Sequence, residues 1–237
     1  MKFARPEVFP YARFTITGTE NIPKDSAAIL CGNHRSYFDI AAVSLAVAKT
    51  GRAVRFLGKK EVFDAPVIGP IASALGGIRV ERGTGSDEPL RAATELINAG
   101  DLVALMPQGT IPRGHAFFDP ILKGRWGAAK LAAATRAPVI PIGIWGTEKV
   151  WPRNAKLPNI TNVTSPPEVI IVVGPPVHLG YTDPDADTVT IMSAISALLP
   201  PEGREYYEPT EDELRRSYPS NYAGDPNAED ERRPGTD

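Results

Sequence analysis

Short apolar runs alternate with helix-like segments over the first 200 residues, and this alternation restricts the possible folds more than any other feature of the chain. Short runs rich in Val, Ile and Leu predict buried strands, and the longer segments between them predict helices. Strands that alternate with helices are typical of an α/β fold, so we expect a mixed, largely buried β-sheet flanked by helices. The predicted strands are 13–17, 27–31, 54–57, 78–80, 102–106, 139–144 and 169–173, and the predicted helices are 37–49, 66–75, 89–98, 125–135 and 188–199.

Two residues add detail to this pattern. Pro141 lies inside the run 139–144, and proline in a sheet is usually confined to an edge strand or a special turn because it has no N–H. Asp187 precedes the helix predicted at 188–199, where a carboxylate can cap the first turn. We therefore expect 139–144 at an edge or beside an unusual turn, and Asp187 at a helix N-terminus.

The composition changes after residue 200, so we expect one domain over 1–200 and a tail over 201–237. The tail is rich in Pro, Gly and charge, which predicts a segment that is surface-hugging, extended or disordered, with one helical turn near 212–216. Eleven Asp or Glu against five Arg give the tail a net charge of −6, and residues 1–200 carry +4. A mildly basic domain suits an anionic substrate or a membrane surface, although scattered, solvated Lys and Arg would give the same total.

Several classes of protein are disfavoured by what the sequence lacks. Cys31 is the single cysteine, so the chain forms no internal disulfide, as fits a reducing compartment. The three histidines have no zinc-type spacing, so we expect no metal. The longest apolar run, 40–48, is far shorter than the ~20 residues that span a bilayer, and "MKFARPEVFP" lacks the apolar region of a signal peptide. We expect a cytoplasmic protein, and without a basic run we expect no nucleic-acid partner.

The stretch "GNHRSYFDI" (32–40) contains a histidine and an aspartate that could act together. If His34 lies in the loop after the strand 27–31 and a helix begins at Ser36 or Tyr37, then Asp39 falls in the first helical turn and can reach the imidazole. A carboxylate on one ring nitrogen fixes the tautomer in which the other nitrogen can accept a proton. Ser36-x-x-Asp39 before an apolar run is also a capping-box pattern, which explains the same residues without catalysis.

Three later stretches hold further candidate residues, each with an ordinary explanation. "GGIRVERG" (76–83) is a short strand with Arg79 in its middle and Arg82 near its end. "MPQGTIPRG" (106–114) is a tight turn after a strand, and "APVIPIGIWGT" (137–147) is an apolar strand. Taken separately, these stretches could be a surface arginine, a turn glycine and a strand with a proline.

In this order and at these spacings, the four stretches resemble the four motif blocks of the glycerolipid acyltransferase (PlsC-like) family, which includes 1-acyl-glycerol-3-phosphate acyltransferase. The resemblance covers about residues 13–175 and implies the family's fold. "FLGKKEVF" (56–63) and "LKGRWGAAKLA" (122–132) are similar to smaller landmarks of the family. The residues that match the blocks are Asn33, His34 and Asp39, then Gly77 and Arg82, then Met106, Pro107, Gly109 and Thr110 around Gln108, and then 139–142 with Pro141.

The resemblance implies transfer of a fatty acyl chain from acyl-CoA or acyl-carrier protein to a hydroxyl of a lysophospholipid, with 1-acyl-glycerol-3-phosphate as the first candidate and no cofactor. It implies that His34 is the general base, that Asp39 orients it, and that Arg82 and Lys59 bind the acceptor phosphate. The turn at Gly109 would let the backbone approach the substrate closely. The candidate substrate-binding residues are Asn33, Arg35, Ser36, Lys59, Arg79, Arg82, Gln108, Gly109, Thr110 and Arg113.

Two departures from the family pattern fall in the third block. Gln108 replaces the usual Glu, and Ile111 replaces an Arg for which Arg113 could substitute. Both changes affect the block linked to the acceptor, so another lysolipid or a glycolipid acceptor remains open. An inactive relative that binds lipid or CoA is the non-enzymatic alternative.

A lipid acceptor implies peripheral contact with the cytoplasmic face of a membrane. "IASALGGIRV" (71–80) and "FFDPILKGRW" (117–126), with the aromatic residues Phe117, Phe118 and Trp126, are candidate contact segments, although core positions would suit them as well. Cys31 is a rival nucleophile because it lies three residues before His34, but a free cysteine at the end of an apolar strand is usually a small buried hydrophobe.

Overall fold

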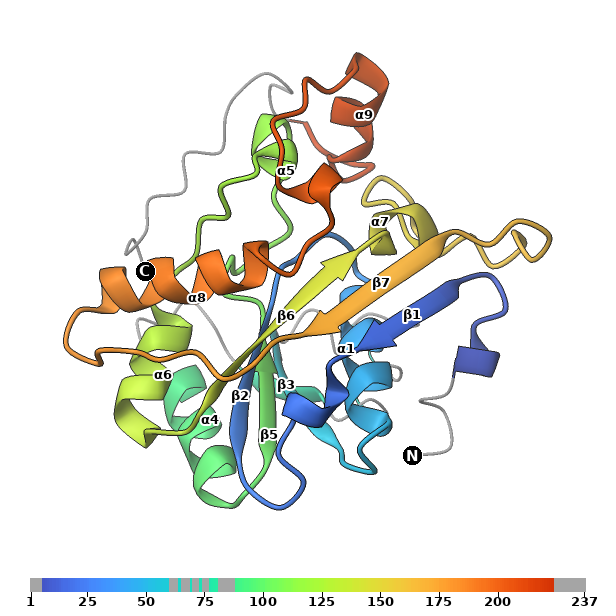
Figure 1. Cartoon of the computed structure of the whole chain (residues 1–237). Helices are drawn as coiled ribbons and strands as arrows, with labels where there is room; N and C mark the ends of the chain where they lie inside the picture. Colours follow the sequence, from blue (N-terminus) through green and yellow to red (C-terminus); the bar gives the residue numbers. More distant parts are fainter. Residues whose placement is uncertain are drawn as a thin grey trace.

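A single sheet forms the centre of the part of the chain that the structure describes. The computed structural model describes residues 6–59, 77–80 and 88–223, with single positions at 64, 69 and 73. Seven strands within these residues pair in the order β1-β7-β6-β2-β5-β3-β4 (Figure 1). They are β1 (Arg13–Thr17), β2 (Ala28–Gly32), β3 (Val54–Lys59), β4 (Gly77–Val80), β5 (Leu102–Leu105), β6 (Val139–Trp145) and β7 (Glu168–Val173).

The strand directions gather several loops at one edge of the sheet. β2 pairs parallel to β5 and to β6, and β3 pairs parallel to β5 and to β4. β1 is parallel to β7, whereas β6 and β7 are antiparallel. The predicted mixed sheet is therefore confirmed. The carboxyl ends of β2 to β6 lie at one edge, and β7 begins at that same edge.

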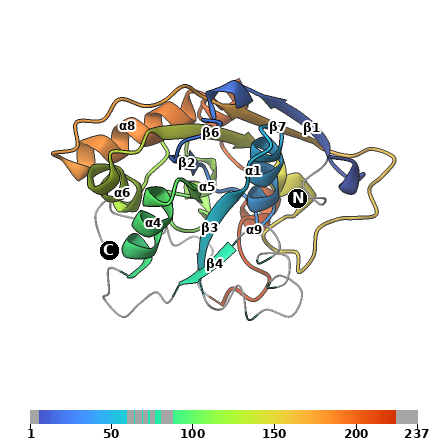
Figure 2. The same ribbon diagram turned by 90° about the horizontal axis from the view of Figure 1, so that it is seen from below.

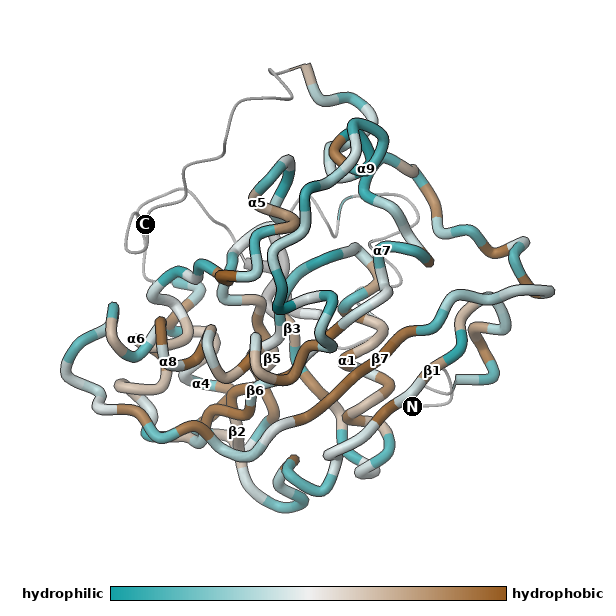
Figure 3. The backbone as a smooth tube through the Cα atoms, turned by 45° about the horizontal axis from the view of Figure 1, so that its top comes forward, coloured by the Kyte–Doolittle hydropathy of each residue, from teal (hydrophilic) through white to brown (hydrophobic). Residues whose placement is uncertain are grey.

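Helices cover both faces of the sheet, which explains why its central strands read as continuous apolar runs. All five residues of β2 are buried. Figure 2 shows α1 on one side of the sheet and α4, α6 and α8 on the other, and two hydrophobic clusters fill the two layers. In Figure 3 the hydrophobic residues concentrate along β2, β6 and β7. These helices are α1 (Asp39–Ala48), α4 (Glu88–Asn98), α6 (Gly127–Thr135) and α8 (Pro184–Ser196).

Short helices lie in several loops between the strands and near both ends of the described chain. Two 3₁₀ turns, η1 (Pro6–Val8) and η2 (Thr19–Asn21), flank β1. The loop after β5 contains α5 (His115–Phe118), and α7 (Thr147–Val150) follows β6 directly. The C-terminal segment contains η3 (Pro201–Gly203) and α9 (Glu211–Arg216).

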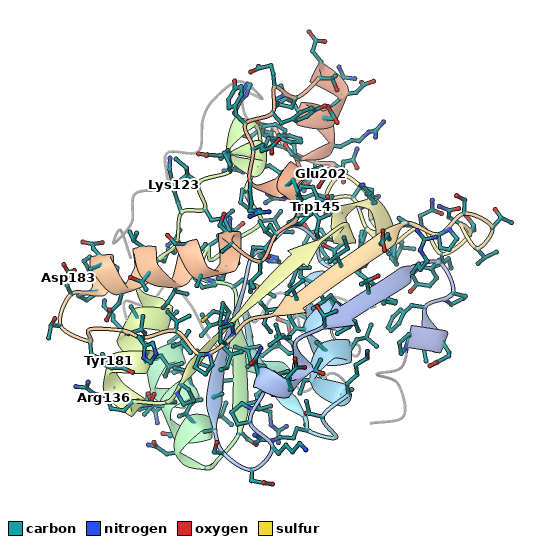
Figure 4. All side chains as sticks on the ribbon, viewed as in Figure 1. Lys123, Arg136, Trp145, Tyr181, Asp183 and Glu202 are labelled. Atoms are coloured by element: carbon teal, nitrogen blue, oxygen red, sulfur yellow. The ribbon has the colours of Figure 1, made fainter. Side chains whose placement is uncertain are left out.

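The C-terminal segment 201–223 packs on the loop after β5, which fits the surface-hugging alternative for the tail. The Gly114 N–H donates a hydrogen bond to Ser217 Oγ (2.7 Å), and the Phe118 and Tyr207 rings lie 6.1 Å apart. Gly203 lies against the ring of Trp145 at the end of β6, in the region where Figure 4 labels Trp145 and Glu202. The expected helical turn is α9, which begins with a Thr210–Glu213 capping box. Residues 224–237 lie outside the described part.

Two finer expectations are corrected. β6 is an interior strand between β7 and β2, not an edge. Pro141 is tolerated because it precedes the β7 ladder, which starts at Ile142, and there its carbonyl accepts the Gly174 N–H (2.9 Å). Asp183, rather than Asp187, caps α8. The carboxylate of Asp187 instead accepts the N–H groups of 180 and 181. The helix predicted at 66–75 lies outside the described residues, apart from single positions.

Gly18 and Gly51 offer a matched test of close backbone packing. Both have positive φ, 75° and 79°. A Cβ at Gly18 would lie 2.0 Å from the Val173 carbonyl oxygen, whereas a Cβ at Gly51 would meet nothing within 4 Å. We expect Gly51→Ala to lower the free energy of unfolding by about 1 kcal/mol and Gly18→Ala by about 3 kcal/mol or more. Urea denaturation followed by circular dichroism measures both, and equal losses would contradict the packing.

Candidate active site

Three neighbouring strands, β6, β2 and β5, bring the candidate residues to one edge of the sheet. His34 follows the end of β2, Gln108 follows β5 and Thr147 follows β6. Because the three strands are parallel, the loops at their carboxyl ends must lie side by side, which is where open α/β sheets place their sites. The blocks that are far apart in the sequence therefore meet here.

His34 and Asp39 form a hydrogen-bonded pair. The His34 Nδ1 atom lies 2.8 Å from Asp39 Oδ2. The Asp39 side chain is fully buried, while 19% of the His34 side chain is exposed. Because a carboxylate can only accept, Nδ1 carries the proton and the lone pair resides on Nε2. The imidazole is therefore held in the tautomer that can take a proton from a bound hydroxyl.

The Asp39 carboxylate is surrounded by hydrogen-bond donors. Oδ2 also accepts the backbone N–H groups of Arg35 (2.7 Å) and Ser36 (2.8 Å), and Oδ1 accepts the Thr147 hydroxyl (2.5 Å). The bond from Ser36 joins the pair that the capping-box pattern names, but the N-cap of α1 is Phe38 and makes no side-chain cap, so the capping-box interpretation does not hold. The helix α1 begins at Asp39, slightly later than expected.

Asn33 and Gln108 fix the backbone on either side of His34. The Asn33 amide donates to the Ile144 carbonyl (2.8 Å) and accepts the Ile144 N–H (2.7 Å), which ties the β2 loop to β6. The His34 N–H donates to Gln108 Oε1 (2.7 Å). A Glu at 108 could accept the same bond, so Gln108 keeps this contact while it removes a negative charge.

Arg35 and Ser36 pack inward. The Arg35 guanidinium forms an ion pair with Glu148 (3.1 Å) and lies over the rings of Phe117 (4.3 Å) and Trp145 (4.1 Å). The Ser36 hydroxyl donates to the Trp151 carbonyl (2.7 Å). These contacts hold the loop in place, and a direct contact of Asn33, Arg35 or Ser36 with substrate stays a prediction.

The turn at Gly109 makes room for an arginine of the same chain. Gly109 has φ 74°, and its N–H donates to the Met106 carbonyl (2.8 Å). A Cβ at this position would lie 2.9 Å from Arg125 Cδ. Next to it, Thr110 directs its hydroxyl toward the Ile111 carbonyl, and Arg113 lies over the Tyr222 ring at 4.8 Å.

The expected phosphate ligands fall on β3 and β4 or just beyond. Lys59 is the last residue of β3, and Arg79 pairs with Gly58 in β4. The side chains of both residues, and the whole of Arg82, lie outside the described part, so their roles stay predictions.

The expected membrane-contact aromatics make contacts within the fold. The Trp126 indole donates to Asp185 (2.6 Å), and Lys130 lies over its ring. Phe117 and Phe118 contact each other, with centroids 5.0 Å apart. The segment 71–80 is described only in part.

Thr147 and Glu148 are site residues that the sequence did not reveal. Thr147 is fully buried, and its hydroxyl donates a hydrogen bond to the Asp39 carboxylate. Glu148 forms an ion pair with Arg35. The available signal was their position, since both directly follow the strand of the fourth block. Polar residues such as Thr147 and Glu148, at the carboxyl end of a strand next to β2, lie within reach of the loop that carries His34.

A family model described as Acyltransferase matches residues 13–145, which is more than half of the chain. The chain belongs to the acyltransferase family. The match includes β1 to β6 and contains both His34 and Asp39. The resemblance indicated by the four blocks is therefore confirmed.

Named relatives and one solved structure agree with this family. A chloroplastic 1-acyl-sn-glycerol-3-phosphate acyltransferase from Brassica napus is 27% identical over 184 residues, covering 76% of this chain and 50% of the relative. An uncharacterized Mycobacterium tuberculosis protein is 33% identical over 148 residues, 59% of this chain and 39% of the relative. This acyltransferase-family chain thus spans half or less of those relatives.

The fold of the acyltransferase-family chain is also that of a solved structure. The crystal structure of the 1-acyl-sn-glycerophosphate acyltransferase PlsC from Thermotoga maritima matches with a TM-score of 0.59 at 23% identity, over 83% of this chain and 76% of that one. Among the described residues, no helix has both the length and the apolar composition needed to cross a bilayer.

Cys31 is poorly placed to act as a nucleophile in this acyltransferase fold. It is completely buried in β2, packed in the cluster on the α4, α6 and α8 side, and burial raises the pKa of its thiol. A raised pKa favours the neutral thiol over the nucleophilic thiolate.

We expect the Cys31 thiol to be unreactive in the folded protein. An aromatic disulfide reagent should release no coloured thiolate from native protein and one equivalent per chain in denaturant, because the chain has a single cysteine. Rapid labelling of the native protein would show that Cys31 is accessible and would reopen the nucleophile hypothesis.

Proposed function

We propose that the protein transfers a fatty acyl chain from the thioester of acyl-CoA or acyl-carrier protein to a hydroxyl of a lysophospholipid, with 1-acyl-glycerol-3-phosphate as the first candidate acceptor. The observation that carries the proposal is the pairing of a part-exposed His34 with a buried, fully hydrogen-bonded Asp39. The names of the plant and bacterial relatives support the reaction type and the first acceptor.

In the proposed reaction His34 acts on the acceptor hydroxyl. As the hydroxyl oxygen attacks the thioester carbon, its proton moves to His34 Nε2. The carbon–sulfur bond then breaks, and the departing thiolate takes the proton from the imidazolium. The product is an ester and a free thiol, without an acyl-enzyme. A positioned base is well matched to a thioester, which is already a reactive acyl donor.

Asp39 contributes by orienting His34 and by stabilising the imidazolium that forms. An ionised carboxylate is costly to bury unless its oxygens are hydrogen-bonded, and the donors around Asp39 meet that need. Thr147 is the donor to the second oxygen, so it acts as a positioning residue through Asp39.

The acceptor phosphate would bind to positive charges at the sheet edge, with Lys59 and Arg82 as first candidates and Arg79 and Arg113 as further ones. Thr110, Gly109 and Gln108 line the turn after β5 and would contact the acceptor. Because Gln108 is neutral, the site lacks one negative charge of the family pattern, which leaves another lysolipid or a glycolipid as the alternative acceptor. The reaction needs no cofactor, and we place it at the cytoplasmic face of a membrane.

We expect His34→Ala to lower acyl transfer by about 10³-fold, because a positioned general base contributes about 10²- to 10⁴-fold. Thiol release from acyl-CoA is measured against lysophosphatidic acid, other lysolipids and glycerol-3-phosphate. His178→Ala is the matched control, since His178 is exposed and outside the site.

Thermal unfolding separates the possible outcomes of this experiment. His34→Ala should keep a melting temperature close to that of the parent. If the parent protein transfers no acyl group to any of these acceptors, the proposed enzymatic function is contradicted, and the lipid- or CoA-binding alternative remains. An unfolded His34→Ala would make the histidine structural, and Asp39→Asn, which keeps the shape of the site, would then test the base.

We expect Thr147→Val to lower turnover about tenfold to hundredfold, because it removes the donor to Asp39 Oδ1 and leaves a buried acceptor unsatisfied at a cost of about 1–3 kcal/mol. Thr147→Ser retains the hydroxyl and should recover most of the rate. The comparison of kcat for the two variants, at equal KM for acyl-CoA, tests the positioning role. Equal losses in both would instead indicate a packing role for the methyl group.

A further inference from the structure

The loop between α7 and β7, residues 151–167, exposes aliphatic side chains close together. Leu157, Ile160 and Val163 are 59%, 59% and 52% exposed within seven residues of chain. Single exposed aliphatic residues are ordinary, but a local group of them marks an interaction surface. Figures 1 and 2 both show this loop projecting beyond the ends of β1 and β7.

Hydrogen bonds within the loop hold it in shape. The Trp151 indole donates to the Ala155 carbonyl (3.1 Å), and the Ala155 N–H donates to the Pro152 carbonyl (2.9 Å). Further along, the Asn159 N–H donates to the Val150 carbonyl (2.9 Å). The aliphatic side chains are therefore presented by an organised loop.

The loop is also tied to the candidate active site. The Trp151 carbonyl accepts the Ser36 hydroxyl, and the Tyr37 ring, which is 41% exposed, lies 5.5 Å from the Trp151 ring. Because β6 and β7 are antiparallel, the connection between them leaves and returns at the sheet edge that carries His34. Whatever docks on this loop is held at that same edge.

The charge around the aliphatic residues identifies the kind of surface that would dock. Residues 149–167 contain Lys149, Arg153 and Lys156 and no Asp or Glu. Both lysines are exposed, whereas Arg153 donates to the carbonyls of Ile111 and Pro112. Aliphatic side chains flanked by lysines suit the boundary between anionic headgroups and acyl chains. One loop also offers far fewer residues than the ~20–30 per side of a stable protein interface.

We propose that residues 149–163, the last two residues of α7 and most of the loop that follows, form a lipid-docking segment in which Leu157, Ile160 and Val163 enter an anionic bilayer while Lys149 and Lys156 meet its phosphates. The inference deepens the proposed function, on which it rests for the identity of the bilayer as the source of the acceptor. Docking here would deliver a membrane-resident lysolipid to the edge of the sheet beside His34.

Binding to vesicles tests the aliphatic part of the loop. Vesicles of phosphatidylglycerol and phosphatidylcholine are sedimented with the full chain and with Leu157→Ser/Ile160→Ser. We expect the double variant to bind about tenfold more weakly or worse, since two exposed aliphatic side chains no longer enter the interface. Val8→Ser/Val189→Ser is the matched control, because Val8 and Val189 are 45% and 61% exposed outside this loop, and it should bind like the parent.

A second pair of variants tests the charge. Lys149→Gln/Lys156→Gln should weaken binding to anionic vesicles and leave the weaker binding to pure phosphatidylcholine unchanged, because only anionic lipid attracts the lysines. Lys24→Gln/Lys49→Gln removes the same charge from exposed positions outside the loop and should have little effect.

The outcomes separate this inference from the proposed function. Vesicle binding that all four double variants share equally would overturn the docking loop, whether or not the protein is an enzyme. A loop variant whose mass in sedimentation velocity falls from that of a dimer would assign the face to self-association and overturn it too. The parent protein could bind vesicles through the loop and yet transfer no acyl group to a dispersed short-chain acceptor. That result would contradict the proposed function but support the docking loop.

Discussion

The buried carboxylate of Asp39 is the constraint on which the rest of the site depends. An ionised carboxylate without hydrogen bonds would cost several kcal/mol in the interior, so the fold must supply donors from fixed positions. They come from the loop after β2 and from the first turn of α7, which follows β6. The loop and α7 must therefore keep one relative position.

Neighbouring contacts maintain that position. Asn33 bonds both backbone groups of Ile144, so the β2 loop cannot shift along β6 without breaking two hydrogen bonds. The ion pair between Arg35 and Glu148 spans the same gap, and its guanidinium is covered by aromatic rings. The conformation of His34 is thus set by the sheet, through side chains that need not touch substrate.

Much of the fold could be predicted because it depends on local pattern. In a short run such as 102–106 the first three residues are fully buried on either face of the sheet, so its apolar composition reveals it as a strand. The His34–Asp39 pair was also accessible, because a five-residue separation across a loop and a helix start is a local geometry. The interior position of β6 could not be predicted, since the sequence does not show that β7 ends at Val173 and pairs with β6 only from Ile142, one residue after Pro141.

The remaining contacts could not be predicted because they join residues far apart in the chain. Thr147 donates to Asp39, which is more than a hundred residues away in the sequence, and the residues next to Thr147 do not indicate that partner. The space beside Gly109 is filled by Arg125, which the sequence alone could not place there. The segment 201–223 has few aliphatic residues, so its sequence did not show that Tyr207, Ser217 and Tyr222 attach it through rings and a hydroxyl.

The attachment of the segment 201–223 shows that the end of the family-model match is not the end of the packed structure. The family model ends at Trp145, but the backbone of Gly114, which lies within the matched region, finds its hydrogen-bond acceptor at Ser217. Gly203 likewise packs against the Trp145 ring. The region that the family model matches is therefore shorter than the region that completes its own packing, and a fragment trimmed to residues 13–145 would expose the surfaces that Ser217 and Gly203 cover.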